Sequence, residues 1–159
     1  MVDVFTPQKR SAVMSRIQGK HTKPELVVRR LLHGMGYRFR LHRRDLPGTP
    51  DILLPGRRTA IFVHGCFWHS HEGCRLASKP HSNQAYWSGK LDRNRRRDQA
   101  SQAALVDAGF DVLTVWECEV KNKEAAREAL ISFFASVPLP GVDRRAILAL
   151  ARSRCSLGG

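Results

Sequence analysis

Residues 46–64 read LPGTPDILLPGRRTAIFVH, and this stretch decides the fold. Two short apolar runs, residues 51–54 and 59–64, are separated by Pro-Gly-Arg-Arg and follow a loop that contains two prolines and a glycine. Short apolar runs bounded by turn-forming residues are typical of two antiparallel strands joined as a hairpin. The sequence therefore predicts a hairpin within the central sheet.

Helix and strand patterns flank this hairpin on both sides. Thr22, followed three residues later by Glu25, forms a capping box, and the apolar stripe behind it continues to Gly34 or Gly36. Further patterns predict a basic helix over 6–17, a strand over 37–41, a long polar helix over 82–108, a strand over 110–116 that ends in a core Trp116, and a last helix over 123–134. This order predicts an α/β domain with a mixed central β-sheet covered by helices on both faces.

The chain has 159 residues and a mass of 18.0 kDa, which suits a single domain. We expect the domain to span residues 1–137, with residues 138–159 as a C-terminal tail. No run approaches the ~20 apolar residues of a membrane span. Residues 1–20 are basic and lack the apolar core of a secretory signal. We therefore expect a cytoplasmic protein with no membrane partner.

Charge is the first indication of function. Lys and Arg number 27 against 14 Asp and Glu, which gives a net charge of +13 and a pI near 10.6. Residues 1–50 carry +8 and residues 51–100 carry +5, so the remainder is neutral overall. Such a polarised excess favours a polyanionic partner, because Lys and Arg release counterions when they neutralise phosphates. Nucleic acid is the favoured partner, and a ribosome-associated or anionic-membrane protein is the alternative.

The hairpin also predicts a cation site. A turn centred on residues 56–57 places Asp51 opposite Phe62 and Val63, so that the Asp51 carboxylate, the Val63 main-chain carbonyl and His64 converge. Carboxylate and carbonyl oxygens are ligands that Mg²⁺ prefers, and such an ion assists phosphodiester hydrolysis. The alternative is a surface aspartate that caps a turn. Pro-Asp followed by two strands matches the first half of the Pro-Asp…(Asp/Glu)-x-Lys nuclease motif, although Phe62 and His64 stand where that motif has its acid and lysine.

The run VHGCFWHSH at residues 63–71, together with PGTPD at 47–51, resembles the very-short-patch repair (Vsr) endonucleases. These enzymes nick DNA beside thymine–guanine mismatches left by deamination of 5-methylcytosine. The resemblance runs from the N-terminal Arg-Ser…Met segment to Val-Trp-Glu-Cys at 115–118, about three quarters of the chain. It implies a restriction-endonuclease-like fold with a structural zinc site and a catalytic Mg²⁺.

The resemblance also implies the roles of individual residues. Asp51 and the Val63 carbonyl hold Mg²⁺ beside the scissile phosphate, in a family that often has threonine at the position of Val63. His69 is the general base toward the attacking water, which suits an unperturbed histidine pKa of about 6.5. His64 contacts the phosphate, and Glu25 completes the shell of metal-bound waters.

Four further residues have the chemistry of a closed zinc site. Three thiolates and one imidazole are a structural Zn²⁺ set, and the family resemblance assigns them that role. The alternative is three buried free cysteines and a surface histidine. We expect Cys155, in the tail, to take no part. The four predicted ligands are Cys66, His71, Cys74 and Cys118.

Aromatic and polar side chains predict the DNA-binding surface. Phe67 and Trp68 are adjacent in a loop, so either one packs inside and one is exposed, or both form a wedge that unstacks and kinks the duplex. The resemblance supports the wedge and adds Met14 from the N-terminal segment. Along the long helix, a solvated charged surface is the alternative to DNA contact, and we expect Arg97 and Asp98 to form a supporting pair. The helix residues predicted to contact DNA are Lys90, Asn94 and Arg97.

The resemblance to this family, which the charge and the site residues support, implies a strand-nicking DNA mismatch endonuclease that cuts 5′ to the thymine of a T·G pair, leaving 5′-phosphate and 3′-hydroxyl ends. A DNA polymerase and a ligase would finish the repair, and mismatch-repair proteins are further partners. We expect a nucleoid-associated monomer. The alternatives are the same nuclease core cutting matched DNA or other mismatches, and a catalytically silent, zinc-stabilised DNA-binding module.

Overall fold

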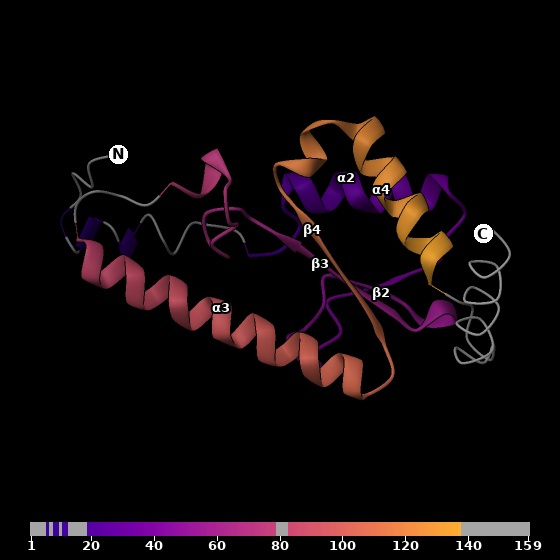
Figure 1. The fold of residues 1–159 in the computed structure, drawn as a ribbon, viewed down its shortest axis with the longest axis horizontal. Coiled ribbons are helices and arrows are strands. Elements are labelled where there is room, and N and C mark those ends of the chain that lie inside the picture. Colours follow the sequence, from indigo (N-terminus) through magenta and orange to yellow (C-terminus); the bar gives the residue numbers. More distant parts are fainter. Residues whose placement is uncertain (1–5, 7, 10, 13–18, 79–82, 138–159) are drawn as a thin grey trace, which may run out of the picture.

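The computed structural model describes residues 6, 8–9, 11–12, 19–78 and 83–137 (Figure 1). Its sheet has the strand order β1-β2-β3-β4. Strands β1 (Arg40–Leu41), β2 (Ile52–Leu54) and β3 (Thr59–His64) are antiparallel neighbours. Strand β4 (Asp111–Trp116) runs parallel to β3. The mixed sheet and the central hairpin are therefore confirmed.

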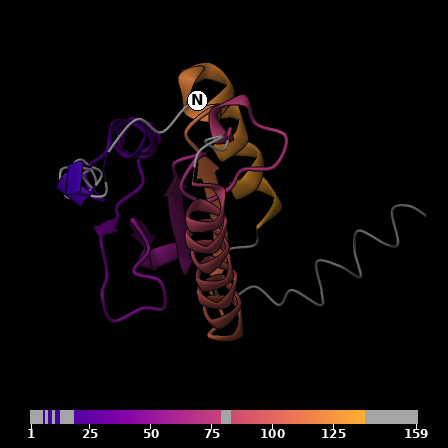
Figure 2. The same ribbon diagram turned by 90° about the vertical axis from the view of Figure 1, so that its left-hand side faces the viewer.

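Helices cover both faces of this sheet, as predicted. Helices α2 (Lys23–Gly34) and α4 (Lys123–Ser136) pack on one face, where Leu32 and Leu130 are buried against the strands. Helix α3 (Gln84–Asp107) runs lengthwise along the other face (Figure 2) and buries Leu105. Three short 3₁₀ helices complete the described elements: η1 (Pro55–Arg57), η2 (Arg75–Ala77) and η3 (Glu119–Lys121).

Local sequence signals explain where the elements that carry the site begin. The capping box that opens α2 is present in full, because the Thr22 side chain accepts from the Glu25 N–H and the Glu25 side chain accepts from the Thr22 N–H. In the hairpin, Ile52 pairs with Ile61. One residue further along, the same register places Asp51 opposite Phe62, close to the end of β3.

The strand predicted over 37–41 is shorter than expected. Only Arg40–Leu41 pairs with β2, because β2 ends at Leu54, and Pro55, which has no N–H, begins η1. Met14, Cys155 and the tail 138–159 lie outside the described residues, as does most of the predicted helix over 6–17. No helix in the described parts of the chain is long and apolar enough to cross a membrane.

Candidate active site

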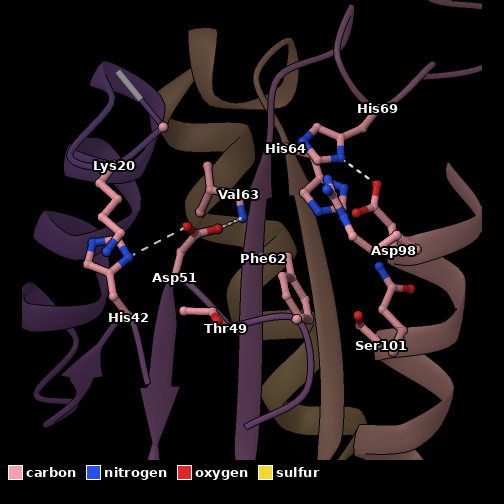
Figure 3. Close-up of a pocket in the computed structure, with 14 residues that line it drawn as sticks. Lys20, His42, Thr49, Asp51, Phe62, Val63, His64, His69, Asp98 and Ser101 are labelled. Carbon is pink, nitrogen blue, oxygen red and sulfur yellow. Dashed lines mark hydrogen bonds and ion pairs between the residues drawn. The ribbon is translucent and has the colours of Figure 1, made fainter. Parts of the chain in front are cut away.

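A cavity of about 480 Å³ opens where β3 ends and β2 begins. Asp51 and Val63 lie on one side of it, and the imidazoles of His64 and His69 lie with Asp98 on the other (Figure 3). The loop before β2, strand β3, the loop after β3 and helix α3 therefore each contribute to one site. Further lining residues include Lys20, His42, Arg97, Ser101 and Gln102.

Asp51 is held at the cavity wall by the hairpin. One of its carboxylate oxygens, Oδ2, accepts a hydrogen bond of 2.8 Å from the Val63 N–H. Burial raises the pKa of Asp51 to about 6, the Val63 N–H opposes that rise, and the charge of Glu25 adds to it. A bound cation would favour the ionised carboxylate. One carboxylate facing a cavity with room for water and phosphate fits Mg²⁺, which keeps several waters when it binds.

The loop that precedes Asp51 packs tightly on α3. Gly48 has a φ of 71°, and a Cβ built on it would lie 2.6 Å from the Cβ of Ser101. Thr49 also has a positive φ, 51°, and its N–H donates to the Leu46 carbonyl at 3.1 Å. A glycine is therefore required at position 48 both for backbone conformation and for the close approach of the helix.

His69 is oriented by a carboxylate on α3. Its Nδ1 lies 2.5 Å from Asp98 Oδ2. An ionised carboxylate only accepts, so Nδ1 carries the proton and the Nε2 of a neutral ring keeps a lone pair for a base. Asp98 was expected to pair with Arg97. That prediction is wrong, since Arg97 instead donates to Asn94 Oδ1 at 3.3 Å. Residues three apart on a helix are neighbours on its surface, whereas consecutive ones do not face each other.

His64 lies behind His69 as a neutral ring. The two imidazoles are stacked, with centroids 3.7 Å apart and planes 8° from parallel. Burial, followed by the neighbouring charge of His69, lowers the pKa of His64 to about 4. Near neutral pH His64 can therefore give a phosphate oxygen a hydrogen bond but not a full positive charge.

Glu25 is buried next to the cavity, on the far side of His42 from Asp51. Only 1% of its surface is exposed, and its carboxylate pairs with Arg29 and lies 3.1 Å from His42 Nε2. The other ring nitrogen of His42 is 3.9 Å from Asp51 Oδ1. Sequence reasoning missed Arg29 and His42, because nothing in the local pattern shows that α2 and the end of β1 meet at this cavity.

The four predicted zinc ligands come together. The parallel pairing of His64 with Trp116 sets Cys66 and Cys118 side by side, each two residues further along. The Nδ1 of His71 lies 3.6 Å from Cys66 Sγ and 3.4 Å from Cys118 Sγ. All four ligand atoms, including the sulfur of Cys74, lie within 4.8 Å of one another. Tetrahedral zinc with Zn–S bonds of about 2.3 Å sets its ligands roughly 3.8 Å apart, so this cluster can hold zinc.

Trp116 is not a core residue, contrary to prediction. It is half-buried, and its ring stacks on His71 with centroids 4.1 Å apart and planes 2° from parallel. Successive strand residues point to opposite faces, and it is Val115 that joins the hydrophobic core. The apolar character of the strand predicted burial but not which side chain faces the Cys/His cluster.

Phe67 and Trp68 are both half-buried and belong to one aromatic group with Trp87 of α3. The ring of Trp87 lies 5.4 Å from that of Phe67 and 6.2 Å from that of Trp68. The ammonium of Lys90 sits 5.5 Å from the centre of the Trp68 ring. The sequence interpretation missed Trp87, although an aromatic one turn before Lys90 on the same helix was a usable signal.

The predicted DNA-contacting residues of α3 share one face. Lys90, Asn94 and Arg97 line a second cavity, of about 440 Å³, which also borders Trp68 and His69. The Asn94 side chain donates to the Trp68 main-chain carbonyl at 3.1 Å. This hydrogen bond fixes the aromatic loop relative to the helix, and the second cavity adjoins the first at His69.

Comparisons with known proteins agree on one family. A family model described as DNA mismatch endonuclease Vsr matches residues 2–75. Type II nicking enzyme V.XorIIP of Xanthomonas oryzae is 52% identical over 82% of this chain and 95% of its own length. Type II nicking enzyme V.NmeAIP of Neisseria meningitidis is 45% identical over 82% of this chain and 92% of its own. DNA mismatch endonuclease Vsr of Escherichia coli is 38% identical over 78% of this chain and 79% of its own length.

Proposed function

The chain belongs to the Vsr family of DNA mismatch endonucleases, and we propose that it nicks one strand of DNA on the 5′ side of the thymine in a T·G mismatch. One observation carries the proposal: a single cavity has the Asp51 carboxylate on one wall and the paired His69 and Asp98 on the other. Relatives named as nicking enzymes support cleavage of one strand.

In the proposed reaction, His69 removes the proton of the attacking water through Nε2, while Asp98 holds the proton on Nδ1. Water attacks phosphorus, the bond to the 3′ oxygen breaks, this oxygen takes up a proton from solvent water, and the products are a 5′-phosphate and a 3′-hydroxyl. His64 keeps the His69 ring in place by stacking and is close enough to the cavity to donate to a phosphate oxygen. A 3′-hydroxyl is the end that a DNA polymerase extends and a ligase finally seals.

Two metal ions are part of the proposal. Asp51 and the Val63 main-chain carbonyl would hold Mg²⁺, with Glu25 ordering its waters. When bound, Mg²⁺ lowers the pKa of water and neutralises charge on the phosphate. The second ion is zinc at the Cys/His cluster, where a set of four protein ligands leaves no position for substrate, so its role is structural.

DNA would bind to a surface formed by the first hundred residues, which carry the net positive charge. Lys90, Asn94 and Arg97 would contact DNA beside the second cavity, and Phe67 and Trp68 would enter the base stack at the mismatch, joined by Met14. Mismatched steps unstack at lower cost, so a wedge selects for them. The hydrogen bond from Asn94 to the aromatic loop supports this arrangement because it couples the wedge to the helix.

The test is nicking of an end-labelled duplex with one T·G mismatch in randomised flanks, with Mg²⁺ and then with EDTA. A matched duplex and the Asp51→Ala variant serve as controls. Cleavage limited to the thymine strand, and lost with EDTA and with Asp51→Ala, is the expected result. Equal cleavage of matched DNA would favour a restriction-like nuclease, and tight binding without a nick would favour a silent DNA-binding module.

A further inference from the structure

A charged cluster lies behind Asp51, and Glu25 is the one member of it that the proposed reaction uses. It consists of His21, Glu25 and Arg29 around the first turns of α2, and His42 just after β1. The Arg29 guanidinium is at its centre: one NH group lies 2.9 Å from His21 Nδ1, and the other contacts Glu25 and lies 3.0 Å from His42 Nε2. Arg29 is itself mostly buried, with 12% of its side chain exposed.

His42 connects this cluster to the cavity. Its Nε2 faces Arg29, while its Nδ1 lies 3.9 Å from Asp51 Oδ1 (Figure 3). The backbone holds it there as well, because the His42 N–H donates to the Asp51 main-chain carbonyl at 3.2 Å. His42 also has a φ of 48°, in the left-handed region that non-glycine residues rarely adopt. Such a conformation persists only where the surroundings impose it.

The chemistry of the neighbours selects one tautomer of His42. Arg29 has only donors, so it requires a lone pair on Nε2, whereas the Asp51 carboxylate has only acceptors and favours a proton on Nδ1. The opposite tautomer would satisfy Glu25, 3.1 Å from Nε2. It would also point an N–H at Arg29 and a lone pair at Asp51, and Glu25 already has the guanidinium as its partner.

We propose that Arg29 is a positioning residue that holds the proton of His42 on Nδ1, and thereby directs an N–H toward Asp51. Each oxygen of the Asp51 carboxylate then faces one N–H: Oδ2 that of Val63 at 2.8 Å, and Oδ1 that of His42. At 3.9 Å the second is an electrostatic contact rather than a hydrogen bond. It fixes the orientation of the carboxylate, so that the remaining lone pairs face the cavity.

The tautomer can be measured directly in the protein without metal or DNA. Two-bond ¹H–¹⁵N correlation spectra of the histidine rings distinguish a protonated from an unprotonated nitrogen. Near neutral pH the wild-type protein should show His42 protonated at Nδ1 only, and Arg29→Met should move the proton to Nε2, toward Glu25. Arg30→Met, which removes the same charge from an exposed neighbour, should leave His42 unchanged. Two results would overturn the proposal: a wild-type protein in which His42 is protonated at Nε2, or an Arg29→Met protein in which the proton of His42 stays on Nδ1.

The consequence for metal binding rests on the proposed function and has its own readout. His42→Gln keeps an acceptor for Arg29 and a donor for Asp51, whereas His42→Leu has a similar volume and neither group. Groups that orient metal ligands typically change affinity by about 10–100-fold. Calorimetric titration with Mn²⁺ should therefore show that loss for His42→Leu and near wild-type affinity for His42→Gln, with DNA affinity in EDTA unchanged in both.

Equal Mn²⁺ affinity in the leucine and wild-type proteins would refute the link from His42 to Asp51. Failure of the proposed function has a different signature. If only the proposed function is wrong, the His42 tautomer and the Mn²⁺ affinities would be as proposed, but neither the wild type nor any variant would nick a T·G duplex.

Discussion

Replacing Asp51 with asparagine should stabilise the metal-free protein while it abolishes nicking. Burial raises the pKa of this carboxyl from 3.8 to about 6, so the folded state binds the Asp51 proton more tightly than the unfolded state. The stabilisation of the folded state by this tighter proton binding at Asp51 is fully present below pH 3.8 and is lost as the pH rises through about 6. Asparagine is neutral at every pH and can still accept from the Val63 N–H.

The size of the effect follows from the two pKa values. Each pH unit between them is worth about 1.4 kcal/mol, so the ionised carboxylate costs the folded state about 3 kcal/mol near pH 8. The Asp51→Asn protein should therefore exceed the wild type in free energy of unfolding by roughly that amount near pH 8, and by less than about 1 kcal/mol near pH 4. Saturating Mg²⁺ should narrow the gap, because it stabilises only the wild type.

The assay is urea denaturation of both proteins in EDTA at the two pH values, repeated with Mg²⁺ at the higher one. Asp92→Asn, which makes the same change at an exposed aspartate on α3, is the matched control. An Asp51→Asn protein that is less stable than the wild type near pH 8, or a difference that does not change with pH, would refute the reasoning.

Three further outcomes follow from the geometry. Asp98→Asn removes the negative charge beside His69 Nδ1 and adds an amide N–H that can donate to this nitrogen, so the proton is no longer held on Nδ1. Single-turnover nicking should fall about 100-fold or more with little change in DNA affinity; equal nicking by the variant would show that this pair is not used. Cys118→Ser should lower both the zinc content and the thermal midpoint, and should change the fluorescence of Trp116, whose ring stacks on a neighbouring ligand; full zinc content would contradict the ligand set. Gly48→Ala puts a methyl carbon 2.6 Å from a side-chain carbon of α3 at a positive φ, and urea denaturation should show a loss of at least about 2 kcal/mol; a smaller loss would mean that the loop moves freely.

Local signals predicted most of the framework. Strand β3 has the predicted bounds, α2 begins at the predicted capping box, and α3 and α4 differ from their predicted ends by two residues or fewer. These features depend on turn chemistry and on the period of apolar residues, both of which lie within a few positions of the element that they define. The strand predicted over 37–41 failed because its length depends on its partner, β2.

The partners of the proposed catalytic side chains were harder to predict. Asp98 was assigned to Arg97, its neighbour in sequence, yet it pairs with His69, 29 residues away. The polar pattern of α3 shows that one face is solvated or bound, but it does not show which end of the sheet that face meets. Trp87 was missed for the same reason: the sequence of α3 shows an aromatic residue near Lys90, but nothing in the loop at Phe67 and Trp68 shows that this part of the helix packs against it.

The sequence alone determined the chemistry that the protein has available: a Pro-Asp loop before a hairpin, a His-rich run after it, four zinc-type ligands and a basic first hundred residues. These are properties of residue type and short spacing. Tertiary structure alone decided which groups act together, including the contact of His42 with Asp51, the stacking of Trp116 on His71 and the pairing of His69 with Asp98. Such contacts arise where α2, α3 and β4 pack around one end of the sheet, and packing between distant segments leaves no periodic trace in the chain.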